Sequence, residues 1–235
     1  HVDCEALPAT LILDDGTAIT GGTLTIGSVG TLEVSTPAGA TLSGVMVSND
    51  HVVHVDEDSV LTLGHSTIAG GTVADDGAIH LVADSAIDGA ALNGGQINID
   101  SDVMLTLNNV VVTGTSIHGA INVDGEASLA LDDASLTGTL TNGGTVAVDL
   151  TYMLMLNDGA IDGGVVTNDG TIHSTGTSAI DNAAITNHGL IAAISGSLTI
   201  DPGTLTNTGT LGADCGGRDS NGEQGGYTCT LAAID

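Results

Sequence analysis

Residues 131–148 read LDDASLTGTLTNGGTVAV, and both halves of this stretch alternate apolar residues with small or polar ones. Alternation with a period of two is typical of a β-strand, because successive side chains point to opposite sides of the strand. Glycine and Asp or Asn pairs interrupt the alternation every few residues, as they do in tight turns. The stretch therefore predicts short strands joined by turns.

The two halves of this stretch recur along nearly the whole chain. The second half recurs around seven glycines: Gly77, Gly95, Gly119, Gly144, Gly170, Gly189 and Gly209. A short period that returns this often indicates stacked repeats, since one unit is too small to bury its own apolar side. We predict an all-β fold, a right-handed parallel β-helix (β-solenoid) with about nine coils of roughly 19–26 residues.

Three segments follow from the limits of the pattern. Residues 1–8 form an N-terminal lead-in, residues 9–211 the β-solenoid repeats, and residues 212–235 a C-terminal loop or cap. Cys215 and Cys229 bracket a short polar loop in the last segment and predict a disulfide, hence an oxidising compartment. Cys4 is left over.

The charge of the chain is extreme. The 235 residues contain 29 Asp and Glu but one basic residue, Arg218, which gives a formal net charge of −28. A nucleic-acid binder needs Lys and Arg to neutralise phosphates, so this class is excluded, as is attraction to anionic lipids. The sequence has no apolar run of about 18 residues, so we predict no membrane insertion. Such a surface attracts cations.

Pairs of Asp or Asn follow the Leu-x-Leu motifs and form the first candidate site. If the coils stack in register, the pairs at 108/109, 132/133 and 157/158 lie one above another. Carboxylate and amide oxygens are the ligands that Ca²⁺ prefers, so the pairs predict a row of Ca²⁺ sites; the alternative is that turns favour these residue types. The candidate metal ligands are Asp14, Asp15, Asp132, Asp133, Asn157 and Asp158.

An asparagine precedes several of the repeat glycines. Stacked side-chain amides can hydrogen-bond from coil to coil, so we predict a structural ladder rather than a catalytic site. Its members are Asn142, Asn168, Asn187 and Asn207.

Other side chains do not converge on a recognisable catalytic pattern. His51 and His54 are three residues apart in a strand-like run, which places them on opposite sides, and the remaining histidines are dispersed. Carboxylates are plentiful, but the near absence of aromatic residues disfavours a sugar-cleaving enzyme. We predict no enzyme activity and no catalytic residues. Threonine pairs at 23/25, 139/141 and 204/206 leave an ice-binding solenoid as a minor alternative.

Three segments resemble the β-strand repeats of large bacterial surface proteins: residues 91–99 (ALNGGQINI), 139–148 (TLTNGGTVAV) and 166–172 (VTNDGTI). These families include autotransporter passengers, filamentous-haemagglutinin-like adhesins and VCBS-type repeat adhesins. The resemblance implies a secreted or cell-surface protein with a structural or adhesive role, a filament subunit among the options. Its expected partners are further copies or neighbouring domains, divalent cations and glycans. A carbohydrate-active or carbohydrate-binding β-helix is the alternative.

Overall fold

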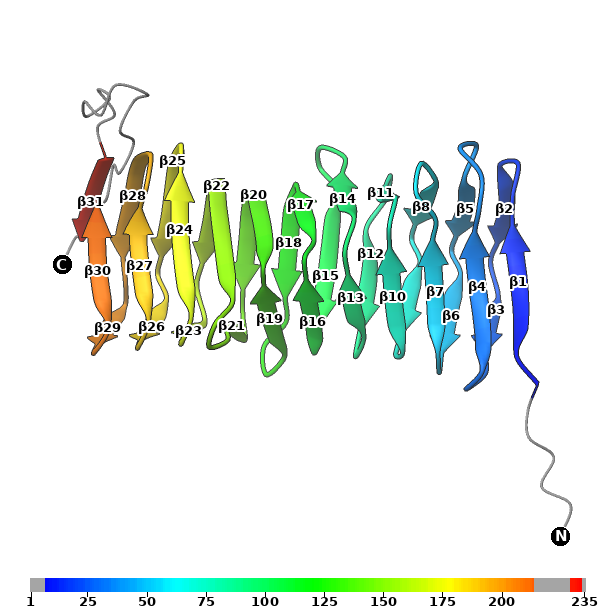
Figure 1. Cartoon of the computed structure of the whole chain (residues 1–235), viewed down its shortest axis with the longest axis horizontal. Coiled ribbons are helices and arrows are strands. Elements are labelled where there is room, and N and C mark those ends of the chain that lie inside the picture. Colours follow the sequence, from blue (N-terminus) through cyan, green and yellow to red (C-terminus); the bar gives the residue numbers. More distant parts are fainter. Residues whose placement is uncertain (1–6, 214–228, 234–235) are drawn as a thin grey trace, which may run out of the picture.

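The chain forms a long rod of stacked coils with its two ends at opposite tips (Figure 1). The computed structural model describes residues 7–213 and 229–233. Within these ranges every regular element is a β-strand, all strand pairs are parallel, and about ten turns form a β-solenoid, which confirms the predicted fold class. The same ranges contain no helix long and apolar enough to cross a membrane.

Each coil contributes one strand to each of three rows, here called faces A, B and C. Face A is an 11-stranded sheet in which every strand pairs with the equivalent strand of the next coil. Its strands are β1 (Ala9–Leu13), β4 (Gly30–Val34), β7 (Val52–Val55), β10 (Thr72–Asp75), β13 (Ala91–Asn93), β16 (Val110–Thr113), β19 (Ser128–Asp132), β21 (Thr145–Val148), β23 (Val165–Asn168), β26 (Ala184–Asn187) and β29 (Thr204–Asn207).

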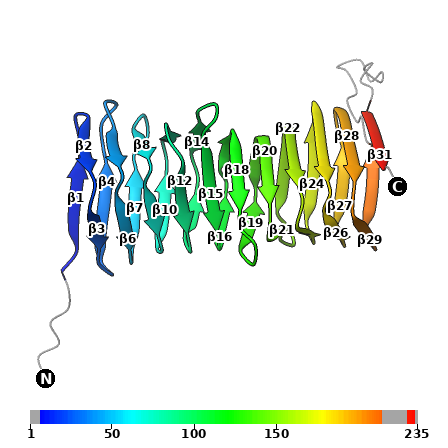
Figure 2. The same cartoon turned by 180° about the vertical axis from the view of Figure 1, so that it is seen from behind.

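Faces B and C lie behind and beside face A (Figure 2) and are joined where two long strands pass through the corner between them. Face B comprises β2 (Thr17–Thr20), β5 (Ala40–Ser43), β8 (Val60–Gly64), β11 (Ala78–Leu81), β14 (Gln96–Ile99), β17 (Ser116–His118), the first parts of β20 (Ala134–Asn142) and β22 (Met153–Asp162), β24 (Thr171–Thr175), β27 (Leu190–Ala193) and β30 (Thr210–Ala213).

Face C contains the second parts of these two long strands. Its members are β3 (Thr23–Ile26), β6 (Met46–Asn49), β9 (Thr67–Ala69), β12 (Ser85–Asp88), β15 (Met104–Asn108), β18 (Ala120–Val123), the ends of β20 and β22, β25 (Thr177–Asp181), β28 (Gly196–Asp201) and β31 (Cys229–Ala233).

The core is a set of aliphatic columns along the rod. On face A, Leu32, Val53 and Val73 occupy successive coils in register, and each is fully buried. Outward neighbours such as Thr31 and Thr72 alternate with them, as the period of two predicts. Each buried aliphatic side chain contributes roughly 1.5–3 kcal/mol, so the stack itself holds the fold together.

The coils are shorter than predicted and more numerous than nine. Partners on face A set the coil length: Ala9 pairs with Gly30, a step of 21 residues, and Ser128 with Thr145, a step of 17. The predicted range of 19–26 was too long at its upper end because the repeat glycines lie at different corners. Gly119 separates faces B and C, and Gly144 separates C and A, whereas the other five separate A and B.

The stack also extends beyond residue 211. Face B continues to Ala213, and β31 returns from the C-terminal segment to pair with β28, Cys229 opposite Gly196. One strand of the segment predicted to be a loop or cap therefore belongs to the solenoid. The predicted Cys215–Cys229 disulfide involves Cys215 and the side chain of Cys229, which, like Cys4, lie outside the described residues.

Candidate functional site

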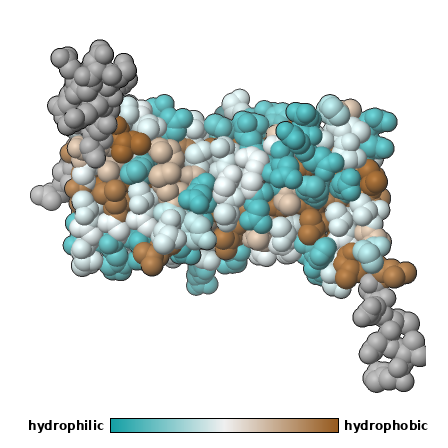
Figure 3. Space-filling view, in the orientation of Figure 1, coloured by the Kyte–Doolittle hydropathy of each residue, from teal (hydrophilic) through white to brown (hydrophobic). Residues whose placement is uncertain are grey.

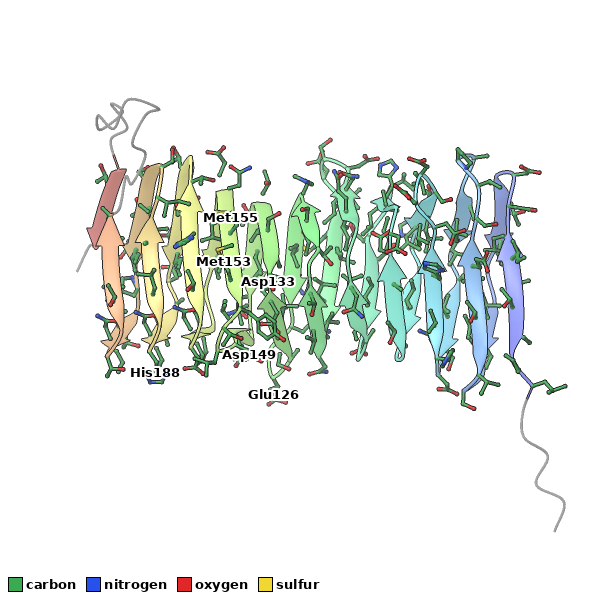
Figure 4. All side chains as sticks on the ribbon, in the orientation of Figure 1. Glu126, Asp133, Asp149, Met153, Met155 and His188 are labelled. Carbon is green, nitrogen blue, oxygen red and sulfur yellow. The ribbon has the colours of Figure 1, made fainter. Side chains whose placement is uncertain are left out.

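Polar side chains gather at the corners between the faces, where the strands end. We name these corners AB, BC and CA after the faces that they join in chain order. Figure 4 shows Asp133, Asp149 and Glu126 gathered near the middle of the rod, with His188 further toward its C-terminal end. The corners are where the sequence places its candidate sites.

The predicted stack of Asp and Asn pairs does not form. Asp132 and Asp133 follow β19 at corner AB, Asn157 and Asp158 lie at corner BC within β22, and the pair at 108/109 lies at corner CA. All three faces share the same alternating pattern, so the local motif does not identify the face. Asp14 and Asp15 share corner AB with Asp132, but at the far end of the rod.

The second member of each pair performs a turn function. Asp15, Asn109, Asp133 and Asp158 all have positive φ, between 49° and 55°. Asp and Asn tolerate this left-handed conformation better than most residues. Two of the side chains also reach the next coil: Asp133 Oδ1 accepts the Met153 N–H (3.2 Å), and Asp158 Oδ1 accepts the Thr177 N–H (2.7 Å). The pairs therefore bend the chain and join neighbouring coils.

No group of three or more His, Cys, Asp or Glu side chains in the described part of the chain is arranged to hold a metal ion. Calcium binding by Asp14, Asp15, Asp132, Asp133, Asn157 and Asp158 stays a prediction.

Three of the four predicted ladder asparagines form a ladder. Asn168 Nδ2 donates to Asn187 Oδ1, and Asn187 Nδ2 donates to Asn207 Oδ1, both at 2.7 Å. Asn168 and Asn187 are fully buried at the end of face A. The ladder starts at Asn168 because the coil before it offers Val148 in register, and a valine side chain has no donor for the buried Asn168 Oδ1.

Asn142 lies at corner CA, so its assignment to this ladder was wrong. It instead joins its own coil to the next one. Its Nδ2 donates to the carbonyls of Gly163 (3.2 Å) and Val165 (3.0 Å), and its Oδ1 accepts the Gly144 N–H (3.0 Å). A side chain at Gly164, which has a φ of +59°, would collide with the amide.

The same arrangement occurs at Asn49, which the sequence analysis missed. Its Nδ2 donates to the carbonyls of Gly70 and Thr72, both at 3.1 Å, and its Oδ1 accepts the His51 N–H at 3.2 Å. We call Asn49 and Asn142 the amide caps. Each is followed 21 residues later by Gly-Gly, a signal that is visible in the sequence.

Asp75 forms a third cap of this kind at corner AB, with a carboxyl group in place of the amide. It is fully buried, Oδ1 accepts the Gly77 N–H and Oδ2 accepts the Gln96 N–H, both at 3.2 Å, and Gly94-Gly95 lies in the next coil. Burial raises the pKa of Asp75 to about 7, and the nearby Asp76 raises it further, against the lowering effect of its two backbone hydrogen bonds and of His54. We call this residue the carboxyl cap.

A second feature absent from the sequence analysis is a row of carboxylates on face C. Asp162, Asp181 and Asp201 occupy three successive coils in register, each after an inward isoleucine. Partial burial raises the pKa of Asp181, and the charges of Asp201 and Asp162 add to this shift. The Oδ1 atom of Asp181 is buried without a hydrogen-bond partner among the described residues. The recurring Ile-Asp dipeptide is the signal that could have found this row.

The histidines pair with acidic neighbours on the outside of the rod. His54 lies 3.0 Å from Asp76 and 3.3 Å from Asp56, and His80 lies 2.8 Å from Asp100. The threonine pairs at 23/25 and 139/141 lie on face C, whereas that at 204/206 lies on face A. These three pairs therefore do not share one face.

No protein-family model, curated protein or solved structure matches this chain.

Proposed function

We propose that this protein is a structural or adhesive element of a bacterial cell surface or extracellular matrix. One observation carries the proposal: the buried polar side chains at the corners hydrogen-bond from coil to coil. Asn49, Asn142 and the Asn168–Asn187–Asn207 ladder all act in this way. A rod whose polar chemistry holds its own repeats together suits a load-bearing or spacing role.

The surface composition supports a location outside the cell. A charge of −28 keeps copies apart and solvated, and cations, which such a surface attracts, would act as counterions or bridges. Surface apolar residues are scattered between polar ones along the rod (Figure 3). The resemblance of the repeats to bacterial surface proteins points the same way.

Immunogold labelling of intact cells of the source organism tests this proposal. We expect label on the outside of unpermeabilised cells, and we expect cells that lack the gene to bind less well to surfaces or to one another. Label confined to permeabilised cells would contradict the proposal. The same cells treated with EDTA test the cation prediction, which requires that chelation disperse the labelled material.

A carbohydrate-active function is the second candidate, favoured by the row on face C. Asp162 and Asp181 lie one strand spacing apart, roughly 4.8 Å, near the separation that retaining glycosidases use for their two carboxyl groups. The raised pKa of Asp181 suits an acid, and the exposed Asp162 suits a nucleophile. Release of reducing ends from a polysaccharide panel, abolished in Asp181→Asn, would support this candidate. An inactive wild-type protein would remove it.

A further inference from the structure

We propose that copies of this chain stack end to end, the last coil of one copy pairing with the first coil of the next. The inference rests on the proposed structural function and names the partner as a second copy. Three independent features of the two ends support it: exposed apolar side chains, the absence of charge on the terminal strands, and matching strand order.

The first coil exposes apolar surface that inner coils bury. Leu11 is 44% exposed, although Leu32, its partner in the next coil, is fully buried. Ile12 is 52% exposed beside it, and a hollow of about 260 Å³ lies between Leu11 and Leu24. Brown apolar surface is visible at this end of the rod, at the right in Figure 3. A further coil stacked here would cover it.

The last coil shows the matching defect. Leu205, Leu211 and Leu231 pack against the core but are only partly buried. The equivalent residues one coil earlier are almost completely buried: Ile185 (1% exposed), Ile191 (0%) and Leu198 (0%). The difference arises because the earlier coil has neighbours on both sides within the described stack.

Neither end carries charge on its strands. The first three strands read ATLIL, TAIT and TLTI, and the last three read TLTN, TLGA and CTLAA. In a chain with 29 acidic residues, these are surfaces on which two copies can approach without burying or opposing charges.

The two ends also match in geometry. Among the described residues, β1, β2 and β3 pair only with strands on their C-terminal side, and β29, β30 and β31 only with strands on their N-terminal side. Both ends present one strand from each face, in the same order and direction. Contact between them continues the parallel pairing, and because the two surfaces differ, the contact does not close and copies add indefinitely.

Sedimentation velocity and negative-stain microscopy of the full chain test the proposal. We expect concentration-dependent rods with an axial repeat of about 50 Å, which is about ten coils at roughly 4.8 Å each. Higher NaCl should lengthen them, since salt screens repulsion between the acidic copies. Leu11→Lys and Ile12→Lys place a charge on the first coil and should abolish assembly. Val111→Lys is the matched control, because Val111 is 46% exposed in the middle of face A, and should leave assembly unchanged.

Mixing separates end-to-end contact from lateral contact. A Leu11→Lys copy can occupy only the first place in a rod, so an equimolar mixture with wild type should reduce the mean length to about two copies. A wild-type chain that stays monomeric at high concentration, or rods that survive both end variants, would overturn the inference. A monomeric protein that still labels the cell surface refutes stacking alone, whereas rods formed by a protein that labels only cell interiors refute the proposed function alone.

Discussion

The carboxyl cap at Asp75 and the amide cap at Asn142 occupy the same kind of site with opposite chemistry. Each is buried and accepts the N–H of the residue two positions later, and each lies against a Gly-Gly pair of the next coil. Asn142 additionally donates to two carbonyls, whereas ionised Asp75 has no proton to donate. A buried carboxylate without a donor should therefore make one coil of the rod sensitive to pH.

The largest expected effect comes from Asp75→Asn. The folded-state pKa of about 7 exceeds the unfolded value of 3.8, so the folded protein binds the proton more tightly. Asp75 stabilises the fold fully below about pH 4, and this contribution is lost as the pH rises toward 7, about 4 kcal/mol in all. Asp75→Asn should raise the free energy of unfolding at pH 8 by an amount of this order and change it little at pH 4. Chemical denaturation at several pH values measures both. An equal gain at both pH values would show that ionisation is not the cause.

The reciprocal change, Asn142→Asp, should transfer the defect. It removes two donated hydrogen bonds and buries a carboxylate, so we expect a loss of roughly 3 kcal/mol at pH 8 and a smaller loss at acid pH. The thermal midpoint of the variant, followed from pH 4 to pH 8, gives the result. If the midpoint of Asn142→Asp shows the same pH dependence as that of wild type, the two caps are not equivalent.

The asparagine ladder tests whether amide capping also matters where side chains stack on one another. Asn187→Ala removes an amide bonded on both sides within the core, so we expect a loss of roughly 2 kcal/mol. Asn207→Ala removes an exposed amide at the end of the ladder and should cost less than about 1 kcal/mol. Hydrogen exchange of the face A amides would locate the loosened coils. Equal effects of the two variants would contradict a cooperative ladder.

The smallest effect concerns an exposed carboxylate that does have amide donors. The side chain of Asn108, and then that of Asn122, lowers the pKa of Asp124 by hydrogen bonding to its carboxylate at 2.8 Å and 2.7 Å. Asn108→Ala should return that pKa toward its ordinary value with little change in thermal midpoint. An NMR titration of Asp124 follows it, and Asn98→Ala on face B serves as control. An unchanged pKa would show that the donors do not set it.

The sequence was enough to predict the solenoid because alternation, frequent glycine and aliphatic residues all indicate the same structure. It could not assign side chains to corners, since Leu-x-Leu followed by a polar pair occurs on all three faces. Asn142 and Asn168 look alike in the sequence, yet one lies at corner CA and the other at corner AB. The register depends on coil lengths that vary from 17 to 21 residues, and only the packed stack fixes them.

The buried position of Asn142 also bears on how the protein ages. Asn-Gly sequences deamidate when the glycine nitrogen attacks the side-chain amide, and Asn142 precedes Gly143. In the folded rod the Gly143 N–H donates to the Val123 carbonyl at 2.7 Å, and the amide itself is held by the next coil, so neither reacting group is free to move. A coil that opens, however briefly, exposes both. Deamidation would then leave an aspartate there, and a damaged coil would close again less readily at neutral pH than in acid.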